Sequence, residues 1–219
     1  MTNLDVIIIG AGFSGLYQLH KCRDELNLNT LVVEEGSDLG GTWYWNTYPG
    51  ARCDSESQTY GYTFSENIYK NWTWNEKYPK QVTILKYLKY VEKKLSLRKD
   101  ILFNNKIISA KYLEGKNLWK LKTNKNKILN CKYLICAVGS LSAANIPEIK
   151  GLNSYEGKYY HTGRWPKNKV SFLFNDPTVQ YDNDRKHAGC CPTLYFYGYI
   201  NGISRSYGKT IFSYTINAI

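Results

Sequence analysis

The chain has 219 residues, of which 43% are hydrophobic and 21% are charged, and its formal net charge is +11 at pH 7. This length allows one large or two small domains with a substantial core. No apolar run reaches the roughly 18 residues of a membrane-spanning helix. Nothing before the first apolar stretch has the pattern of a signal peptide. We therefore expect a cytoplasmic protein without a membrane span.

The excess of positive charge does not by itself indicate a nucleic-acid partner. The lysines are scattered along the sequence, with clusters only on predicted solvated faces, and no nucleic-acid-binding motif accompanies them, so we expect no nucleic-acid binding. The six cysteines lack the spacing of zinc ligands, so no metal site is predicted. Cys131 and Cys136 lie in or beside an apolar strand and are expected to be buried thiols.

An apolar strand followed by a glycine motif stands near the start of the chain. The stretch Val6–Ile9 is apolar at every position, which is typical of a strand buried on both faces of a parallel sheet. It runs into Gly-x-Gly-x-x-Gly at Gly10, Gly12 and Gly15, and residues 16–22 continue as a helix. Such glycines allow a tight turn and close approach of a diphosphate, whose charge the helix N-terminus favours. The motif predicts a dinucleotide site.

A second strand with an acidic end supports this prediction. Residues 30–33 form an apolar run that ends at Glu34. This acid lies about 20 residues past the glycines, where a carboxylate can accept hydrogen bonds from ribose hydroxyls. The acidic pair Glu34 and Glu35 favours FAD or NAD over NADP. The alternative is a glycine-rich turn without a ligand, which the order of strand, glycines, helix, strand and acid disfavours.

Residues 36–57 are rich in glycine and aromatic side chains and cannot form one regular element. A long irregular loop inside a compact domain is usually functional. Gly40 and Gly41 allow close backbone approach, and the Trp and Tyr rings offer flat surfaces for a ring system. A packing loop whose aromatic side chains fill the core is equally compatible with the composition.

The following residues predict one helix and several strands. Residues 82–97 have apolar side chains every three or four positions, Val82 among them, which indicates an amphipathic helix. Strands are predicted for four short apolar or alternating runs, of which the last is expected to be buried: residues 101–103, 106–110, 118–121 and 132–139. Together with the first two strands, these elements predict an α/β fold.

Two longer motifs go beyond this general pattern. Residues 40–46 read Gly-Gly-Thr-Trp-Tyr-Trp-Asn, and residues 48–57 read Tyr-Pro-Gly-Ala-Arg-Cys-Asp-Ser-Glu-Ser. This loop resembles the flavin-binding loop of the Baeyer–Villiger monooxygenases, the cyclohexanone monooxygenase-like flavoproteins. The family fingerprint Phe-x-Gly-x-x-x-His-x-x-x-Trp, followed by Pro or Asp, also has a match. Tyr155 replaces its Phe, and the other positions are Gly157, His161, Trp165 and Pro166.

The resemblance implies a three-layer, Rossmann-like FAD-binding domain at residues 1–166, with a parallel sheet and a small β meander. It also implies a flavin- and NADPH-dependent monooxygenase, which uses O2 to convert a ketone into an ester or lactone through a C4a-peroxyflavin. The FAD-binding positions are then Gly10, Gly12, Phe13, Ser14 and Gly15 for the diphosphate, Glu34 for the ribose, Ile107 for the adenine, and Thr42, Trp43, Tyr44, Trp45, Asp54 and Tyr60 for the flavin.

The resemblance also gives roles to three neighbouring loop residues and to the fingerprint histidine. Asp54 matches an acid that pairs with an arginine beside the flavin, and this arginine keeps the flavin peroxide anionic. Arg52 and Cys53 match residues on the path of the nicotinamide of NADPH. His161 matches a residue that supports the linker, and an isolated histidine is more often a hydrogen-bonded structural residue than a catalyst.

The likeness ends near residue 172, where the family continues into a second Gly-x-Gly-x-x-Gly that binds NADPH. No such motif follows here, so we expect the NADPH domain and its arginine to be missing and residues 167–219 to be a divergent tail without a recognisable domain. The tail is either a frameshifted or mis-spliced end or a genuine short domain. Alternatives to an active Baeyer–Villiger enzyme are a non-catalytic FAD-binding fragment and an N- or S-oxidising flavin monooxygenase. A plain NAD-dependent dehydrogenase explains neither motif.

Overall fold

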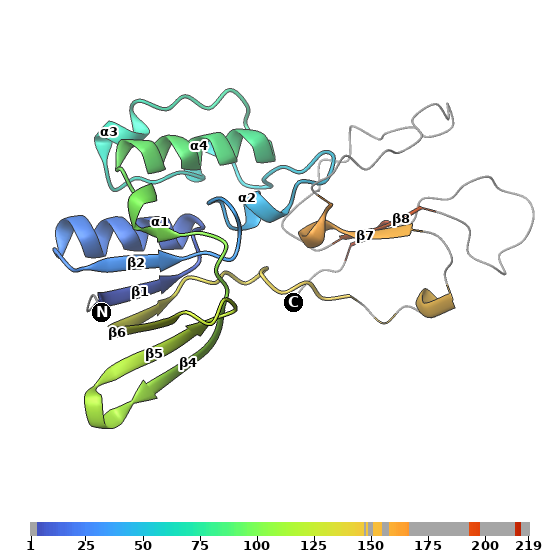
Figure 1. Cartoon of the computed structure of the whole chain (residues 1–219). Coiled ribbons are helices and arrows are strands. Elements are labelled where there is room, and N and C mark those ends of the chain that lie inside the picture. The colour runs from blue at the N-terminus through green and yellow to red at the C-terminus, as the bar shows by residue number, and fades with distance from the viewer. Residues whose placement is uncertain are drawn as a thin grey trace, which may run out of the picture. The chain divides into compact units, whose positions relative to one another are not determined.

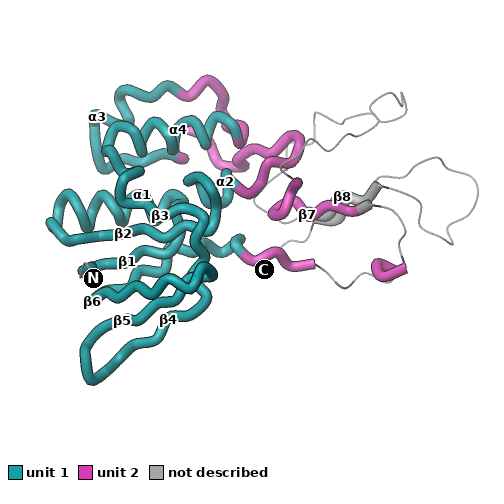
Figure 2. Tube along the Cα trace, in the orientation of Figure 1, with its two compact units in different colours: residues 1–44, 61–73, 82–142 teal, residues 45–60, 74–81, 143–219 magenta. Residues whose placement is uncertain are grey.

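The computed structural model describes residues 4–146, 148, 151–154, 158–166, 193–197 and 213–215. The chain divides into two compact units, which are described separately (Figure 2). The first unit contains residues 1–44, 61–73 and 82–142, and the second contains residues 45–60, 74–81 and 143–219. None of the helices in the described residues is long and apolar enough to cross a membrane.

Six strands form the sheet of the first unit: β1 (Leu4–Ile9), β2 (Thr30–Val33), β3 (Ile101–Leu102), β4 (Ile107–Leu113), β5 (Leu118–Thr123) and β6 (Ile128–Cys136). Their order is β3-β2-β1-β6-β5-β4. The first four strands in this order pair in parallel, whereas β6, β5 and β4 form an antiparallel meander. Because β6 pairs with both β1 and β5, the two parts are one mixed sheet. The predicted α/β fold is confirmed.

Two helices of the first unit connect the parallel strands, and Figure 1 shows both on the same side of them. Helix α1 (Phe13–His20) joins β1 to β2 and is extended by a π-helical turn at Lys21–Glu25. Helix α4 (Gln81–Lys94) precedes β3. Two one-turn helices lie between them in the sequence, α2 (Thr42–Trp45) and α3 (Glu66–Tyr69).

The core of this sheet joins its parallel strands to its meander. Ile7 and Val33 of the parallel part cluster with Leu121, Leu129 and Cys131 of the meander, and all five are buried. Strand β6, which was expected to be buried throughout, is only half buried. Leu129 and Cys131 lie in this cluster, whereas Tyr133 is 60% exposed.

Helix α4 buries one stripe of side chains, Ile84, Tyr87, Leu88 and Val91. This spacing of three and four residues is that of an amphipathic helix, as predicted. The assignment of Val82 to the apolar face was wrong, because its side chain is 56% exposed. Val82 stands two positions before Ile84, a rotation of roughly 200° around the helix, and therefore lies on the opposite side.

The two cysteines of β6 have opposite environments. Cys131 is fully buried, as expected, but Cys136 is exposed, so the expectation of a buried thiol was wrong there. The two residues are separated by five positions, an odd number, so their side chains leave the strand on opposite faces. Burial raises the pKa of the Cys131 thiol to about 11.

The second unit contains a small antiparallel sheet, β7-β8-β9 (Lys158–His161, Thr193–Tyr197 and Ser213–Thr215). The strand that carries His161 thus pairs with the first of two strands from the predicted tail. Tyr48 and Ala51 cluster with Trp165 and Tyr160 in the core of this unit. A boundary at residue 166 remains a prediction. Gly157 and most of residues 167–219 lie outside the described residues.

The contrast between the two thiols of β6 can be measured with a maleimide. At about pH 7.5 the thiolate is the reactive form, so exposure and pKa act together to favour Cys136. We expect the native protein to be modified at Cys136 at least about tenfold faster than at Cys131, as followed by peptide mass spectrometry. In denaturant both should react. Equal rates in the native protein would contradict the assigned faces of β6.

Candidate dinucleotide site

The glycine motif forms a turn at the carboxyl ends of three parallel strands. Gly10 follows β1 with φ = 101°, a conformation that favours glycine. Its N–H donates to the carbonyl oxygen of Val33 at 2.9 Å, and Ala137 N–H, after β6, donates to Ile9 at 2.9 Å. A Cβ on Gly10 would lie 2.6 Å from the Ala137 carbonyl oxygen. The turn therefore has space for a backbone but for no side chain.

The second half of the motif packs α1 against its own loop. A Cβ on Gly15 would lie 1.8 Å from the carbonyl oxygen of Gly10, so only glycine fits there. Gly12 faces Gly41, where φ is 53° and an added Cβ would lie 2.9 Å from the Cα of Gly12. Gly40 N–H donates to Ala11 at 2.9 Å. The aromatic loop and the glycine turn thus form one cradle of bare backbone at the N-terminus of α1.

Glu34 closes this cradle from the end of β2. One carboxylate oxygen accepts from Ala11 N–H at 2.7 Å, and the other accepts from Gly36 N–H at 2.6 Å. The residue is only 5% exposed. Sequence reasoning assigned Glu34 to a ribose and missed this second role, in which the carboxylate holds two loops together. Each carboxylate oxygen has a further lone pair with which a ribose hydroxyl can interact.

The segment before β4 lies beside Glu34. Asn104 N–H donates to Gly36, and Asn105 N–H donates to the Glu34 carbonyl oxygen, both at 2.9 Å. Ile107, the predicted adenine contact, starts β4 two residues later. The structure therefore brings the predicted ribose and adenine positions together, and their role in binding stays a prediction.

The short helix α2 carries the predicted flavin-side residues Thr42, Trp43 and Tyr44. Trp43 is buried, with 3% exposure. The Tyr44 hydroxyl accepts from Ser37 N–H at 3.0 Å, and its ring would meet a Cβ on Gly36 at 2.6 Å. Since Gly36 also binds Glu34, the ring of Tyr44 lies next to the predicted ribose position. Contact of any of the three with a flavin is untested.

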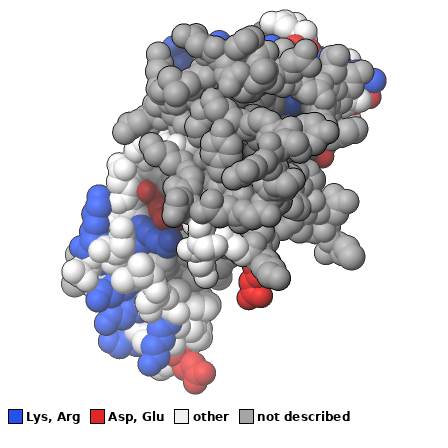
Figure 3. Space-filling model, turned by 90° about the vertical axis from the view of Figure 1, so that its right-hand side faces the viewer, with Lys and Arg blue, Asp and Glu red and all other residues white. Residues whose placement is uncertain are grey.

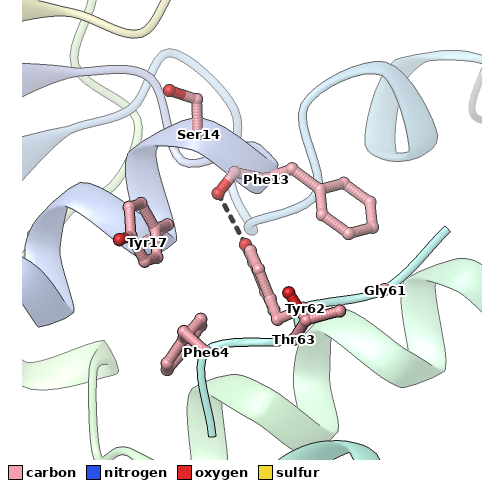
Figure 4. A pocket seen from close by; sticks show the side chains of 7 residues that line it. All are labelled: Phe13, Ser14, Tyr17, Gly61, Tyr62, Thr63 and Phe64. Atoms are coloured by element: carbon pink, nitrogen blue, oxygen red, sulfur yellow. Dashed lines mark hydrogen bonds between the residues drawn. The ribbon is translucent and has the colours of Figure 1, made fainter. Parts of the chain in front are cut away.

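An aromatic pocket of about 390 Å³ lies against the first turns of α1 (Figure 4). The Tyr62 hydroxyl donates to the Phe13 carbonyl oxygen at 2.5 Å, and Tyr62 N–H donates to the Tyr87 hydroxyl at 2.7 Å. Burial raises the pKa of Tyr62 well above its usual value. Through Tyr62, helix α4 thus holds the first turn of α1. Ser14 is exposed beside this pocket, whose other lining residues are Tyr17, Gly61, Thr63 and Phe64.

The predicted NADP-path residues lie in the second unit. Cys53 is buried, its N–H donates to Pro79 at 2.9 Å, and burial raises the pKa of its thiol. Arg52 donates to the Tyr78 carbonyl oxygen at 3.3 Å. Asp54 is exposed, and Trp45 and Tyr60 are half buried in the same unit. Because the two units are separate bodies, the meeting of these residues with the cradle stays a prediction.

Three of the fingerprint residues, His161, Trp165 and Pro166, lie in the described part of the second unit. His161 Nδ1 accepts from Gly163 N–H at 3.1 Å, and its Nε2 lies 3.2 Å from the Asn145 carbonyl oxygen. These partners fit a neutral ring that donates from Nε2, which agrees with a structural histidine. Trp165 packs on Tyr160 with ring centroids 5.5 Å apart, and Pro166 follows it half buried.

Comparison with known proteins identifies the family. Residues 7–173 match the family described as pyridine nucleotide-disulphide oxidoreductase. The chain belongs to this family. A member from Pseudooceanicola batsensis, a Baeyer–Villiger monooxygenase, is 41% identical over 165 residues, which are 75% of this chain and 30% of the relative. The phenazine N-monooxygenase of Lysobacter antibioticus is 43% identical over 165 residues, again 75% and 30%.

A solved structure gives the same result for the fold. Cyclohexanone monooxygenase from Rhodococcus sp. Phi1, bound to NADP+, superposes with a TM-score of 0.73 at 42% identity. The match covers 77% of this chain and 32% of that enzyme. The resemblance to Baeyer–Villiger monooxygenases is confirmed, and the chain spans about 30% of the length of the relatives it matches.

The close approach of Gly15 to Gly10 predicts that any side chain at position 15 destabilises the fold. Gly15→Ala should lower the free energy of unfolding by more than about 2 kcal/mol, because backbone atoms must move. The matched control is Gly115→Ala, since a Cβ there meets no atom within 4 Å. The control should change stability by less than about 0.5 kcal/mol in urea unfolding. Equal stability of both variants would contradict the packing described.

Proposed function

We propose that the protein is an FAD-dependent monooxygenase of the Baeyer–Villiger type, which oxidises a ketone to an ester or lactone with NADPH and O2. The observation that supports this most strongly is the cradle of Gly10, Gly12, Gly15 and Gly41, closed by Glu34, in a chain about 40% identical to such enzymes. Because the chain spans about 30% of these relatives, the complete reaction is part of the proposal.

The cradle fits the diphosphate of FAD because it presents backbone and no side chains. The first N–H groups of a helix have no partner within the helix, and the helix dipole favours negative charge at this end. We assign the diphosphate to residues 10–15, a ribose to Glu34 and the adenine to the backbone of Ile107. Bound flavin supplies the oxidation–reduction chemistry and the activation of O2.

The remaining assignments concern the flavin ring and NADPH. In this proposal Thr42, Trp43, Tyr44, Trp45 and Tyr60 orient the flavin and exclude water from it. Asp54 is exposed and able to pair with a cation, and so to orient that charge toward the flavin. Arg52 and Cys53 lie on the NADPH path.

A second candidate is oxidation at nitrogen. The phenazine N-monooxygenase is as similar to this chain as the Baeyer–Villiger relative, so the matched region does not separate the two reactions. Product analysis with a cyclic ketone and with a nitrogen heterocycle distinguishes them, because one yields a lactone and the other an N-oxide. We favour the ketone because Trp165 and Pro166 complete the Baeyer–Villiger fingerprint.

We further propose that the protein acts in the cytoplasm. The four described cysteines, Cys22, Cys53, Cys131 and Cys136, are all free thiols. Free thiols are usual where the compartment is reducing.

FAD binding by the 219-residue chain tests the proposal. We expect the purified protein to retain FAD through gel filtration, as read from its visible absorbance. Gly12→Ala should keep its fold, since the new Cβ lies 3.4 Å from Gly41 Cα, yet its methyl group occupies the approach of the diphosphate. FAD affinity should fall at least about tenfold in this variant, while Gly115→Ala should bind like the parent. Loss of FAD from the parent itself would contradict the proposal.

Addition of NADPH to the FAD-loaded chain extends the same experiment. The sequence holds no second Gly-x-Gly-x-x-Gly, so we expect the flavin absorbance to persist with NADPH and to bleach with dithionite. Bleaching by NADPH together with ketone-dependent oxygen uptake would contradict the expectation that these 219 residues alone bind flavin without turnover.

A further inference from the structure

The positive charge of the chain is concentrated in one stretch of the sheet. Residues 101–136 contain eight lysines, no arginine and one acid, Glu114, which is a net charge of +7 out of +11 for the whole chain. These residues form β3 and the meander of β4, β5 and β6. Eight of the 23 lysines of the chain therefore gather in this stretch, whereas the sequence alone suggested a scattered arrangement. In Figure 3 the blue lysine and arginine atoms crowd the lower part of the molecule, at the height where Figure 1 places β4 and β5.

The strand register places several of these lysines on one face. Lys111 of β4 lies directly opposite Lys120 of β5, and Asn130 of β6 continues the row. Lys122 stands two positions after Lys120 and therefore points the same way. All three lysines are exposed, whereas Leu121 between two of them is fully buried on the other face. We call the side with Lys111, Lys120 and Lys122 the lysine face.

In the described residues, no acid forms an ion pair with the lysines of the lysine face. Lys106 pairs with Glu35 and Lys132 pairs with Asp5. None of the other six lysines of the stretch forms an ion pair with an acid of the described residues: Lys111, Lys116, Lys120, Lys122, Lys125 and Lys127. Like charges directly opposite on neighbouring strands destabilise a sheet. An anionic partner would remove this repulsion.

The chemistry of the lysine face favours a bilayer over a nucleic acid. Single-stranded nucleic acids are bound by aromatic rings that stack on bases. Tyr112 and Trp119 instead pack against each other on the opposite face of the meander, with their ring planes tilted by 57°. Lysine is a flexible point charge without the planar fork with which arginine recognises one phosphate. Ile128, which is opposite Lys122, is 46% exposed and offers an apolar side chain to the interface.

We propose that the lysine face docks the protein on the surface of a bilayer that contains anionic phospholipids. Each lysine near such a surface adds about 1 kcal/mol of attraction, so several together give reversible, salt-dependent binding. The proposal is independent of FAD binding, because the lysine face and the glycine cradle use different residues.

Sedimentation of the full 219-residue chain with vesicles tests the proposal. Phosphatidylcholine vesicles with about one-third phosphatidylserine should bind the chain, and pure phosphatidylcholine vesicles should not. The triple variant Lys111→Gln, Lys120→Gln and Lys122→Gln should lose at least about tenfold in partitioning. The control triple variant Lys86→Gln, Lys93→Gln and Lys99→Gln removes the same charge from exposed positions on α4 and after it, and should lose less than about twofold.

Two further measurements complete the test: urea unfolding of the lysine-face variant and binding of a single-stranded RNA. Without vesicles, the lysine-face variant should unfold at the same or a slightly higher urea concentration than the parent, because the substitution removes repulsion. Equal loss of vesicle binding in both triple variants would show an effect of net charge alone and overturn the proposal. Tight binding of a single-stranded RNA, with no binding of the anionic vesicles, would overturn the assignment of the partner as a bilayer.

Discussion

The hydrogen bonds of the Glu34 carboxylate are the interaction on which the site depends. Two loops that are distant in sequence, the glycine turn after β1 and the start of the aromatic loop after β2, are held by one side chain through Ala11 and Gly36. Hydrogen bonds from N–H groups to a carboxylate are stronger than those between neutral groups. Burial of this residue to 5% exposure protects these hydrogen bonds from water.

Around this bond the glycines act as a set and not as separate turns. Gly15 admits the carbonyl of Gly10, and Gly12 admits Gly41, so that α1, β1 and the aromatic loop approach one another at backbone distance. Tyr62 adds a further constraint, because its hydroxyl donates to Phe13 and its N–H donates to the hydroxyl of Tyr87 on α4. The result is a helix N-terminus fixed in place next to glycine backbone, to which an anionic diphosphate can come close.

The sequence predicted the parallel part of the fold well because its signals are local. The strand, the glycine motif, the helix and the acid all stand within a short βαβ unit, where spacing determines geometry. The helix α4 was predicted, but Val82 was placed on the wrong side because composition does not mark where the buried stripe begins. The exposure of Cys136 follows from strand alternation and from the pairing of β6 with its neighbours. Pairing between strands distant in sequence is not encoded in local composition.

The double role of Glu34 and the lysine face also could not be predicted from local sequence. A carboxylate after β2 is a ribose signal in the sequence, and only the folded chain shows that its oxygens also accept from Ala11 and Gly36. The lysines of residues 106–132 look evenly spaced in the sequence, yet the register of β4 and β5 brings Lys111 opposite Lys120. Hydrogen bonds and charges that act across the sheet become visible only once the strands are paired.

In the proposed function, Glu34 shapes the cradle in which FAD binds. The most direct test compares Glu34→Gln with Glu35→Gln by FAD titration, because the second residue has only an exposed ion pair with Lys106. An amide can accept with only one of its two ends, so one of the N–H groups of Ala11 and Gly36 would lose its partner. We expect Glu34→Gln to weaken FAD binding at least about tenfold and to lower the free energy of unfolding by about 1–3 kcal/mol, and Glu35→Gln to change neither. FAD affinity that is equal in both variants and the parent would contradict this role of Glu34.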